Sequence, residues 1–201
     1  MKTFARLALA MSVVSVLGSS ALGCDDPVPP VRKGAVRFEL GTVTPALKDD
    51  KGNTINCTWN GSELKMGIVD GNGHTPVDEE QGDYRVNCRV AADGTFAASL
   101  SGPRTSTTQL SFDIQGKAVQ GGDAQGVTVS FADSQFGPYQ SNPTASCTVS
   151  LSTAGGDNAL AVAAGRIWGR FSCPRLSIVD QTDTSSCSVL AGYFVFENCD
   201  E

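Results

Sequence analysis

From residue 35 onward, apolar and polar residues alternate along most of the chain, beginning with Val36, Phe38 and Leu40. A period of two is typical of β-strands with one buried face. Asn-Gly at 60–61 and Asp-Gly at 93–94 lie between alternating runs and predict hairpin turns, because these residues tolerate positive φ. Ten or so short strands with Gly-rich turns predict an all-β fold, a β-sandwich or flattened barrel of short antiparallel strands.

The other predicted strands place one apolar residue at every second position. These inward positions are Ile55, Cys57 and Trp59; Leu64, Met66 and Ile68; Tyr84, Val86, Cys88 and Val90; Phe96, Ala98 and Leu100; Leu110, Phe112 and Ile114; Val127, Val129 and Phe131; and Ala145, Cys147, Val149 and Leu151. The pattern contains no convincing internal repeat, so residues 35–201 are expected to form a single β-sandwich domain.

Two segments depart from simple alternation. The run SVLAGYFVFENC, residues 188–199, is apolar on both faces, with Val189 and Val195 expected to point one way and Leu190 and Phe194 the other. Such a strand belongs between two layers or under a loop. The segment GDNALAVAAGRIW, residues 156–168, fits either a capped helix or a strand, and the strand is favoured.

The first residues of the chain have the form of an export signal. Lys2 and Arg6 precede an apolar stretch from Leu7 to Leu17, after which small residues follow. The apolar stretch is short for a span of the hydrocarbon layer. We therefore expect residues 1–23 to be a signal peptide that is removed on export.

Cys24 follows Ala21, Leu22 and Gly23 at the point where cleavage is expected. This arrangement resembles the lipobox of bacterial lipoproteins, although Ala21 and Leu22 stand in the reverse of the usual order. The resemblance implies that the Cys24 thiol carries a lipid that attaches the exported protein to a bacterial membrane. The outer membrane or the cell surface is expected rather than the inner membrane. Residues 24–34, rich in proline, would form a short extended tether.

The number of cysteines is odd, seven in all, and this fits the interpretation of Cys24 as a lipid site. If Cys24 carries lipid, the other six can form three disulfides, as exported proteins commonly do. Fifteen connectivities are open, and Cys173 with Cys187 is the preferred pair because both flank one predicted connection between strands. The six disulfide cysteines are Cys57, Cys88, Cys147, Cys173, Cys187 and Cys199.

Charge argues against nucleic acid as a partner. The whole chain has a formal net charge of −6, and loss of Lys2 and Arg6 with the leader makes the remainder more negative by two charges. Nucleic-acid binding needs a basic surface. The chain also has a single histidine, His74, which removes most acid–base and nucleophilic triads and most His-based metal sites. We predict no catalytic residue, no metal and no cofactor.

The loop DGNGHTPVDEE, residues 70–80, offers carboxylate and amide oxygens around His74. A calcium site is one interpretation, but the EF-hand spacing is absent because Thr75 and Gln81 occupy the positions of its glycine and glutamate. A solvated acidic turn is the favoured interpretation. A pair of catalytic carboxylates across a cleft is disfavoured because these acids are neighbours on one loop.

Three aromatic residues are candidate ligand contacts. Phe136 and Tyr139 flank a Gly-Pro turn in DSQFGPYQSNP, and they would form either a binding platform or a small core under the loop. Trp168 lies between Arg166 and Arg170 in RIWGRFSCP, where guanidinium groups could stack on the indole. This segment, together with GYFVFENC after it, resembles uncharacterised β-rich lipoproteins of predatory and gliding soil bacteria, a resemblance that implies no activity.

These observations predict a non-catalytic envelope lipoprotein that binds or scaffolds a partner, either an envelope protein or a glycan. A carbohydrate- or calcium-binding module is the first alternative, and a carboxylate-based hydrolase is the second. A flat apolar patch would favour the scaffold. An exposed Phe136 and Tyr139 platform would favour the binding module, and a groove lined by Asp or Glu would favour the hydrolase.

Overall fold

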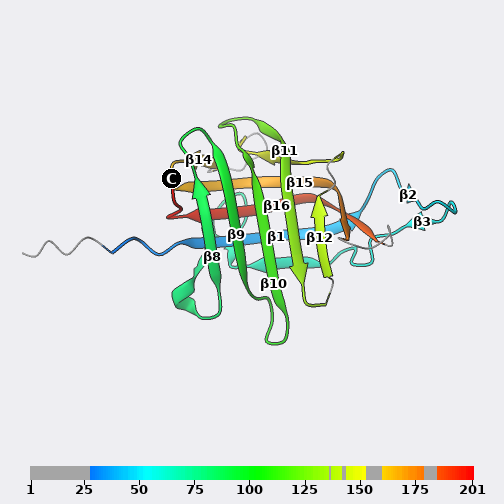
Figure 1. Ribbon diagram of the computed structural model, residues 1–201, viewed down its shortest axis with the longest axis horizontal. Coiled ribbons are helices and arrows are strands. Elements are labelled where there is room, and N and C mark those ends of the chain that lie inside the picture. The colour runs from blue at the N-terminus through cyan, green and yellow to red at the C-terminus, as the bar shows by residue number, and fades with distance from the viewer. Residues whose placement is uncertain (1–27, 136, 142–143, 153–159, 179–184) are drawn as a thin grey trace, which may run out of the picture.

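The computed structural model describes residues 28–135, 137–141, 144–152, 160–178 and 185–201. Two layers of antiparallel strands cross at a steep angle, as Figure 1 shows. The front layer contains β8 (Arg85–Val90), β9 (Thr95–Pro103), β10 (Gln109–Lys117), β11 (Asp123–Asp133) and β12 (Gly137–Ser141). The back layer contains β1 (Lys33–Thr42), β4 (Glu63–Met66), β15 (Arg166–Ile178) and β16 (Ser186–Glu197). The predicted all-β fold is confirmed.

Shorter elements complete the described part of the chain. They are β2 (Leu47–Lys48), β3 (Thr54–Ile55), β5 (Ile68–Val69), β6 (His74–Thr75), β7 (Val77–Asp78), the 3₁₀ turn η1 (Glu79–Gln81), β13 (Cys147–Ser150) and β14 (Ala161–Ala163). The strand interpretation of residues 156–168 is confirmed from β14 onward, while residues 156–159 lie outside the described residues. In the described residues, no helix has the length and apolar character needed to cross a bilayer.

The two layers are joined at both sides, so the strands form a small barrel. The order is β4-β1-β16-β15-β12-β11-β10-β9-β8, and β13 also pairs with both β11 and β15 at the corner between the layers. At the other side, Asp200 pairs with Arg89 of β8. The amide of Val90 donates to the carbonyl of Asp200 over 2.8 Å, and the amide of Asp200 donates to the carbonyl of Cys88 over 3.0 Å.

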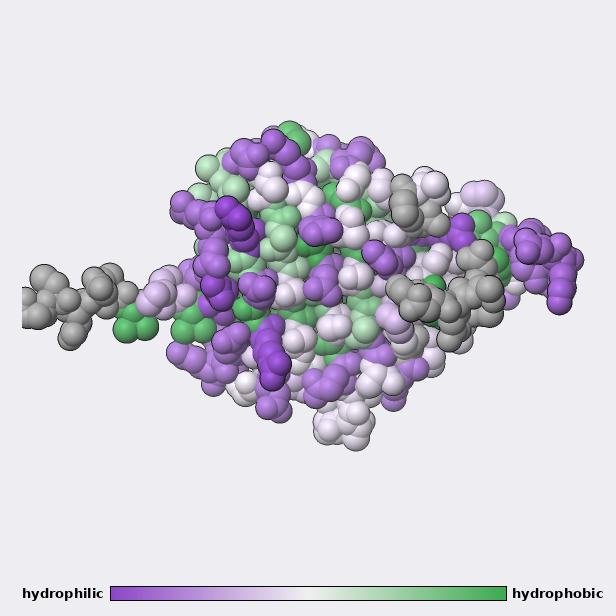
Figure 2. Space-filling view, in the orientation of Figure 1, coloured by the Kyte–Doolittle hydropathy of each residue, from purple (hydrophilic) through white to green (hydrophobic). Residues whose placement is uncertain are grey.

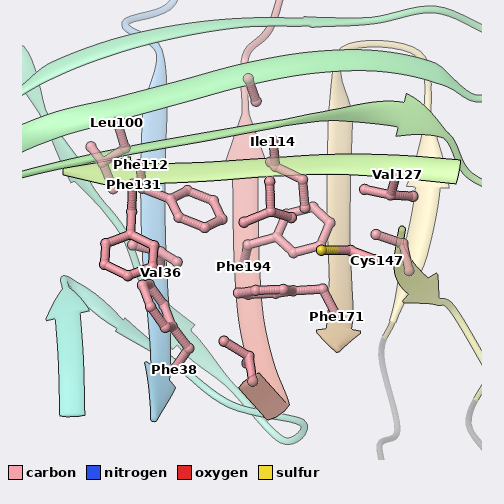
Figure 3. Close-up of a cluster of buried hydrophobic side chains, with 14 of the residues drawn as sticks. Val36, Phe38, Leu100, Phe112, Ile114, Val127, Phe131, Cys147, Phe171 and Phe194 are labelled. Atoms are coloured by element: carbon pink, nitrogen blue, oxygen red, sulfur yellow. The ribbon is translucent and has the colours of Figure 1, made fainter. Parts of the chain in front are cut away.

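The core between the layers is rich in phenylalanine (Figure 3). Phe38 lies 5.2 Å from Phe131 and 5.7 Å from both Phe112 and Phe171, measured between ring centroids. Phe194 extends the cluster with a centroid 6.1 Å from Phe171. The rings are tilted or edge-on, which is the arrangement that aromatic pairs favour. Phe38, Phe112 and Phe131 point inward, as the alternation in β1, β10 and β11 predicted.

A β-bulge changes the faces predicted for β16. Gly192 pairs with Phe38 and Phe171, but Val189 is the next partner on both neighbouring strands, so β16 holds one extra residue there. The extra residue reverses the alternation. Val189 therefore points into the core with Phe194, and Leu190 is 84% exposed. The predicted opposite placement of Val189 and Phe194 is wrong, whereas the expectation of two apolar faces holds because Val195 is buried in a second cluster outside the sheet.

Glycine also interrupts the strand predicted to run through Leu64, Met66 and Ile68. Gly67 has φ +67°, a conformation that glycine adopts readily, and it ends β4. Ile68 is consequently 65% exposed, while Val69 is buried. The alternating strand expected over residues 55–59 is likewise confined to β3, and the chain turns after it.

All six predicted disulfide cysteines form disulfides, and each is buried. The pairs are Cys57–Cys187, Cys88–Cys199 and Cys147–Cys173. The preferred pairing of Cys173 with Cys187 is wrong. The register that sets Thr148 opposite Ser172 brings Cys173 beside Cys147 instead.

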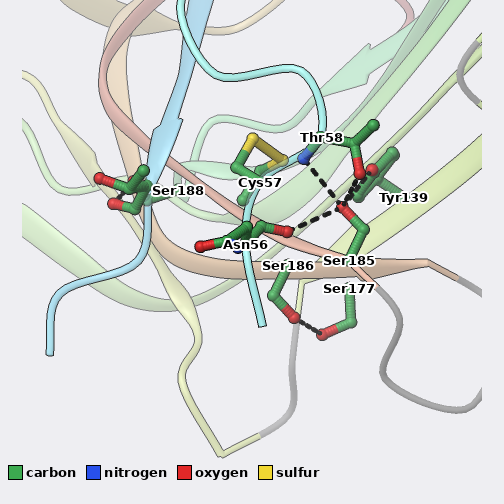
Figure 4. Close-up of a disulfide and its surroundings, with 10 residues drawn as sticks. Asn56, Cys57, Thr58, Tyr139, Ser177, Ser185, Ser186 and Ser188 are labelled. Carbon is green, nitrogen blue, oxygen red and sulfur yellow. Dashed lines mark hydrogen bonds between the residues drawn. A yellow bond between two sulfur atoms is a disulfide. The ribbon is translucent and has the colours of Figure 1, made fainter. Parts of the chain in front are cut away.

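Cys187 is joined to the segment before β4, and a buried polar network lies beside this disulfide (Figure 4). The hydroxyl of Ser185 donates to the carbonyl of Asn56 over 3.2 Å and accepts from the amide of Thr58 over 3.2 Å. Its oxygen also lies 3.0 Å from the hydroxyl of Tyr139. Satisfied buried polar groups of this kind favour one arrangement of the chain.

The end of the predicted tether belongs to the folded domain. β1 begins at Lys33, two residues before the predicted boundary. Arg32 donates to both carboxylate oxygens of Asp200 over 2.8 and 2.7 Å, and the amide nitrogen of Asn198 donates to the carbonyl of Val31 over 2.8 Å. The chain is therefore attached to the C-terminal end of the barrel from residue 31 onward.

Candidate functional site

The outer face of the front layer carries small polar side chains in register across its strands. In the central row Asn87, Ser99, Asp113, Ser130 and Gln140 lie opposite one another on β8, β9, β10, β11 and β12. Strand neighbours are about 4.8 Å apart, so the row spans about 19 Å. The side chains of these residues point away from the core because the alternating positions of each strand are buried.

Two further rows flank Asp113 on β9, β10 and β11. Ser101, Ser111 and Ala132 form one row, and Ala97, Gln115 and Thr128 form the other. Together with Ser99, Asp113 and Ser130 they make a three-by-three grid of about 10 by 14 Å, which we call the polar grid. The polar grid holds four serines, one threonine, two alanines and one glutamine around a single carboxylate.

A hollow lies over the polar grid because its side chains are short. The hollow has a volume of about 410 Å³ and is bordered by Asn87 and Gln140 at the ends of the central row. A second hollow of about 680 Å³ adjoins it over Ala97, Gln115 and Thr128. Figure 2 shows this face, where small residues in white and pale green cross the middle and strongly hydrophilic side chains in purple lie among and around them.

Asp113 has an unusual environment for a strand residue. Within the described part of the chain, no hydrogen bond or ion pair reaches its carboxylate, although the side chain is solvent-accessible. The packed sheet around it displaces water and raises the pKa of Asp113 above its ordinary value. The carboxylate is therefore available to a ligand, and its ionised form is less well solvated than that of a fully exposed aspartate.

The aromatic residues predicted as ligand contacts lie elsewhere. Tyr139 is fully buried, stacks on Phe131 at 5.2 Å and contacts Ser185 through its hydroxyl. Burial raises the pKa of Tyr139, and the hydrogen bond with Ser185 opposes that shift. Phe136 lies outside the described residues. An exposed platform that includes Tyr139 is therefore contradicted, and the alternative of a core position holds for this residue.

Trp168 is also buried, in the small cluster on the outside of the back layer. Its indole Nε1 donates to the carbonyl of Asp70 over 3.1 Å, and its ring lies 4.4 Å from that of His74. The predicted stacking of a guanidinium group on the indole is present, with Arg166 6.0 Å from the ring centroid. Trp168 covers the sheet as a structural residue and does not present its ring to a ligand.

The acidic loop around His74 is occupied by internal contacts. The carboxylate of Asp70 accepts from the amides of Asn72 and Gly73, which lowers its pKa. The buried carboxylate of Asp78 caps η1 and lies 3.9 Å from Lys33. No group of three or more His, Cys, Asp or Glu among the described residues is arranged to hold a metal ion. The favoured interpretation, a solvated acidic turn, fits the exposed Glu79 and Glu80, whereas Asp78 is buried.

The sequence contained a signal for the polar grid that the search for aromatic and catalytic residues did not use. Around Asp113, the outward positions of three consecutive strands are uncharged, with serine, threonine, alanine or glutamine at every second residue. Cys24, the predicted lipid site, lies outside the described residues.

Comparison of the chain with protein-family models, with curated proteins and with solved structures found no match. The function is therefore inferred from the geometry and chemistry of the chain's own residues. Among the surfaces formed by described residues, the polar grid combines a hollow, aligned hydrogen-bonding groups and an unpaired carboxylate.

Proposed function

We propose that this protein is an exported envelope lipoprotein whose barrel binds an extended glycan on the polar grid. The observation that carries the proposal is the registered row from Asn87 to Gln140, with Asp113 at its centre and a hollow above it. Hydroxyl, carboxamide and carboxylate groups supply both donors and acceptors for a polyhydroxylated ligand. Their spread over five strands suits a chain of several sugars better than a compact ligand.

The barrel gives the polar grid the rigidity that binding requires. The three strands that carry the polar grid, β9, β10 and β11, are each paired on both sides because they lie in the interior of the front layer. Sites on regular elements hold their geometry better than sites on loops, so a ligand orders few protein groups when it binds. The proposed role is therefore recognition by a preformed surface.

The disulfides support the proposed anchor. Because the six other cysteines pair with one another, Cys24 has no partner left within the chain. An exported protein rarely keeps one unpaired thiol, whereas a lipidated cysteine removes this difficulty. Attachment near the N-terminus would hold the barrel close to the membrane, since the chain joins the folded domain at residue 31.

The proposal is non-catalytic. Glycoside hydrolysis commonly uses two carboxylates on opposite sides of the scissile bond. The polar grid offers Asp113 alone, and Asp93 at the rim of the adjoining hollow is held by Lys117 over 3.1 Å and by Thr95. These contacts lower the pKa of Asp93 to about 2, so it would not act as an acid near neutral pH.

A partner protein is the second candidate, and one observation favours it. The bulge in β16 exposes Leu190, and this side chain lies beside Arg170 at the edge of a hollow of about 300 Å³ on the back layer. A large apolar side chain next to arginine is common at protein interfaces. The scaffold role would use this face and leave the polar grid unaltered.

Binding to immobilised oligosaccharides tests the glycan proposal. Ser130→Arg fills the hollow and places a cation beside Asp113, so it should abolish binding while the protein remains folded. Ser172→Arg is the matched control, since it makes the same change at a half-buried serine on β15 of the back layer. Retained binding by Ser130→Arg, or equal loss in both variants, would show that the polar grid is not the site.

Metabolic labelling with a clickable palmitate tests the anchor separately. The wild-type protein should carry the label and fractionate with membranes, and Cys24→Ala should do neither. Equal labelling of the two proteins would rule out lipidation at Cys24 without bearing on the glycan site.

A further inference from the structure

The single charge in the polar grid has eight uncharged neighbours. Asp113 lies between Ser99 and Ser130 in its row, between Ser111 and Gln115 along its own strand, and diagonally opposite four small residues. Those four are Ala97, Ser101, Thr128 and Ala132. The immediate surroundings therefore provide hydrogen-bonding partners and space, but no positive charge.

Three basic residues lie at the border of the polar grid, and two of them contact other residues. Arg89 on β8 donates to the C-terminal backbone of Glu201 over 3.1 Å, and Lys117 at the end of β10 pairs with Asp93. Arg85 lies on β8, the strand next to β9, opposite Ser101 at one corner of the polar grid. None of these side chains forms an ion pair with Asp113, so its charge is not neutralised within the described structure.

Aspartate is also unfavourable at this position for the fold. It is among the residues depleted in β-strands, and among the described residues no hydrogen bond or ion pair compensates for its partial desolvation. Positions where a residue contradicts its local structure without a compensating contact are expected to be functional. The chemistry of an unpaired carboxylate in a hollow matches a positively charged group on the ligand.

We propose that the glycan bound by the polar grid carries amino groups, and that Asp113 selects it by pairing with a protonated amine of the sugar. This inference rests on the proposed glycan-binding function and names the ligand class. Hydroxyls of the same sugar would contact Ser99 and Ser130, which lie on either side of Asp113. Asn87 and Gln140 would contact neighbouring sugars along the row.

A basic peptide would satisfy Asp113 as well, but the rest of the face does not favour it. Peptides that bind sheets commonly pair with an unpaired strand edge. In the polar grid the backbone groups of β9, β10 and β11 are already used between strands, so a peptide could not add to the sheet there. A glycan does not need such an edge, since its hydroxyls bond to side chains.

Titration calorimetry with two hexasaccharides tests the inference. The probes are the hexamer of glucosamine, whose amino groups are protonated, and the hexamer of N-acetylglucosamine, whose nitrogens are neutral acetamides, at a pH where both the amine and Asp113 are ionised. The charged hexamer should bind about tenfold more tightly, the effect of one charge-assisted hydrogen bond. Asp113→Asn should remove this preference, and Asp123→Asn, with the same change of charge outside the polar grid, should retain it.

Thermal unfolding separates the proposed role from a structural one. Asp113→Asn should unfold at the same temperature as the wild type or higher at neutral pH, because it removes a poorly solvated charge. A carboxylate that stabilises the fold would give the opposite result. A lower unfolding temperature in Asp113→Asn would therefore contradict the role assigned to Asp113.

The outcomes distinguish this inference from the function on which it rests. Equal binding of the two hexamers, or a preference that survives in Asp113→Asn, overturns the inference and leaves glycan binding in place. Absence of binding to every oligosaccharide overturns both. Tighter, Asp113-dependent binding of a pentalysine peptide than of the glucosamine hexamer would assign the site to basic peptides and overturn the inference.

Discussion

Replacing Gly192 by alanine should disturb the centre of the core. Gly192 lies in β16 between Phe38 of β1 and Phe171 of β15. A Cβ atom at this position would lie 2.4 and 2.5 Å from Cε1 and Cζ of the Phe171 ring, and 2.9 Å from Cβ of Phe38. Both phenylalanines are buried, so neither ring can move into solvent to make room.

The magnitude follows from two opposing effects. Forcing extra volume into a packed core costs about 1–3 kcal/mol. Alanine also reduces the conformational freedom of the unfolded chain, which stabilises the folded state by about 0.4–1 kcal/mol. The net loss should be about 1–2 kcal/mol, or about 2–8 °C in the midpoint of thermal unfolding for a domain of this size.

Urea unfolding of the oxidised domain, followed by tryptophan fluorescence, measures this loss as a lower midpoint with an unchanged slope. Gly73→Ala is the control, because nothing lies within 4 Å of the added Cβ atom and φ is not positive there. The control should be as stable as the wild type or more stable by up to about 1 kcal/mol. A Gly192→Ala variant as stable as this control would contradict the packing of Phe171 over Gly192.

Three further predictions concern charge and disulfides. Asp133→Ala should cost about 3–5 kcal/mol in urea unfolding. Its buried carboxylate lies 2.8 Å from Nε of Arg104, at an angle too poor for a hydrogen bond, and an unchanged midpoint would mean that the ion pair does not form. Because the folded-state pKa of Asp113 is raised, the stability of the wild type relative to Asp113→Asn should fall as pH rises from below about 4, the usual pKa of unfolded aspartate, through the folded-state value. Identical pH profiles of the two proteins would contradict the shift. Replacing Cys57 and Cys187 together by alanine should cost about 2–5 kcal/mol, since this bond links residues 130 apart, and a smaller effect than loss of the bond between residues 26 apart would contradict the loop-length argument.

Alternation predicted the front layer well because short turns join its strands. The Asp-Gly turn at 93–94 keeps β8 and β9 in the register that the pattern implies, and their buried residues are the predicted ones. The back layer was harder to predict. One extra residue in β16 and the positive φ of Gly67 each reverse the faces that follow, and neither change alters the local composition.

The candidate site was not predicted for a related reason. A strand's period shows that Tyr139 and Gln140 point in opposite directions, but it does not show which direction is the core. Tyr139 is in fact inward, and Gln140 ends the central row of the face. The row itself depends on the register between five strands, which the residues within any one strand do not determine.

The disulfide partners could not be predicted from the sequence for the same reason. The parity of the cysteines predicted three disulfides, and three are present. Their partners depend on contacts between segments far apart in sequence, such as Cys88 with Cys199 across 111 residues. Spacing along the chain favoured Cys173 with Cys187, whereas strand pairing joins each to another partner.

The central claim is that six cysteines form three disulfides within the barrel, which leaves the Cys24 thiol for attachment of the proposed lipid. Peptide mapping by mass spectrometry, on unreduced protein extracted from membranes, tests this claim most directly. We expect three linked pairs, Cys57–Cys187, Cys88–Cys199 and Cys147–Cys173, and an N-terminal peptide that starts at a lipid-modified Cys24. A peptide that joins Cys24 to another cysteine, or a mature chain that retains residues 1–23 without lipid, would contradict it.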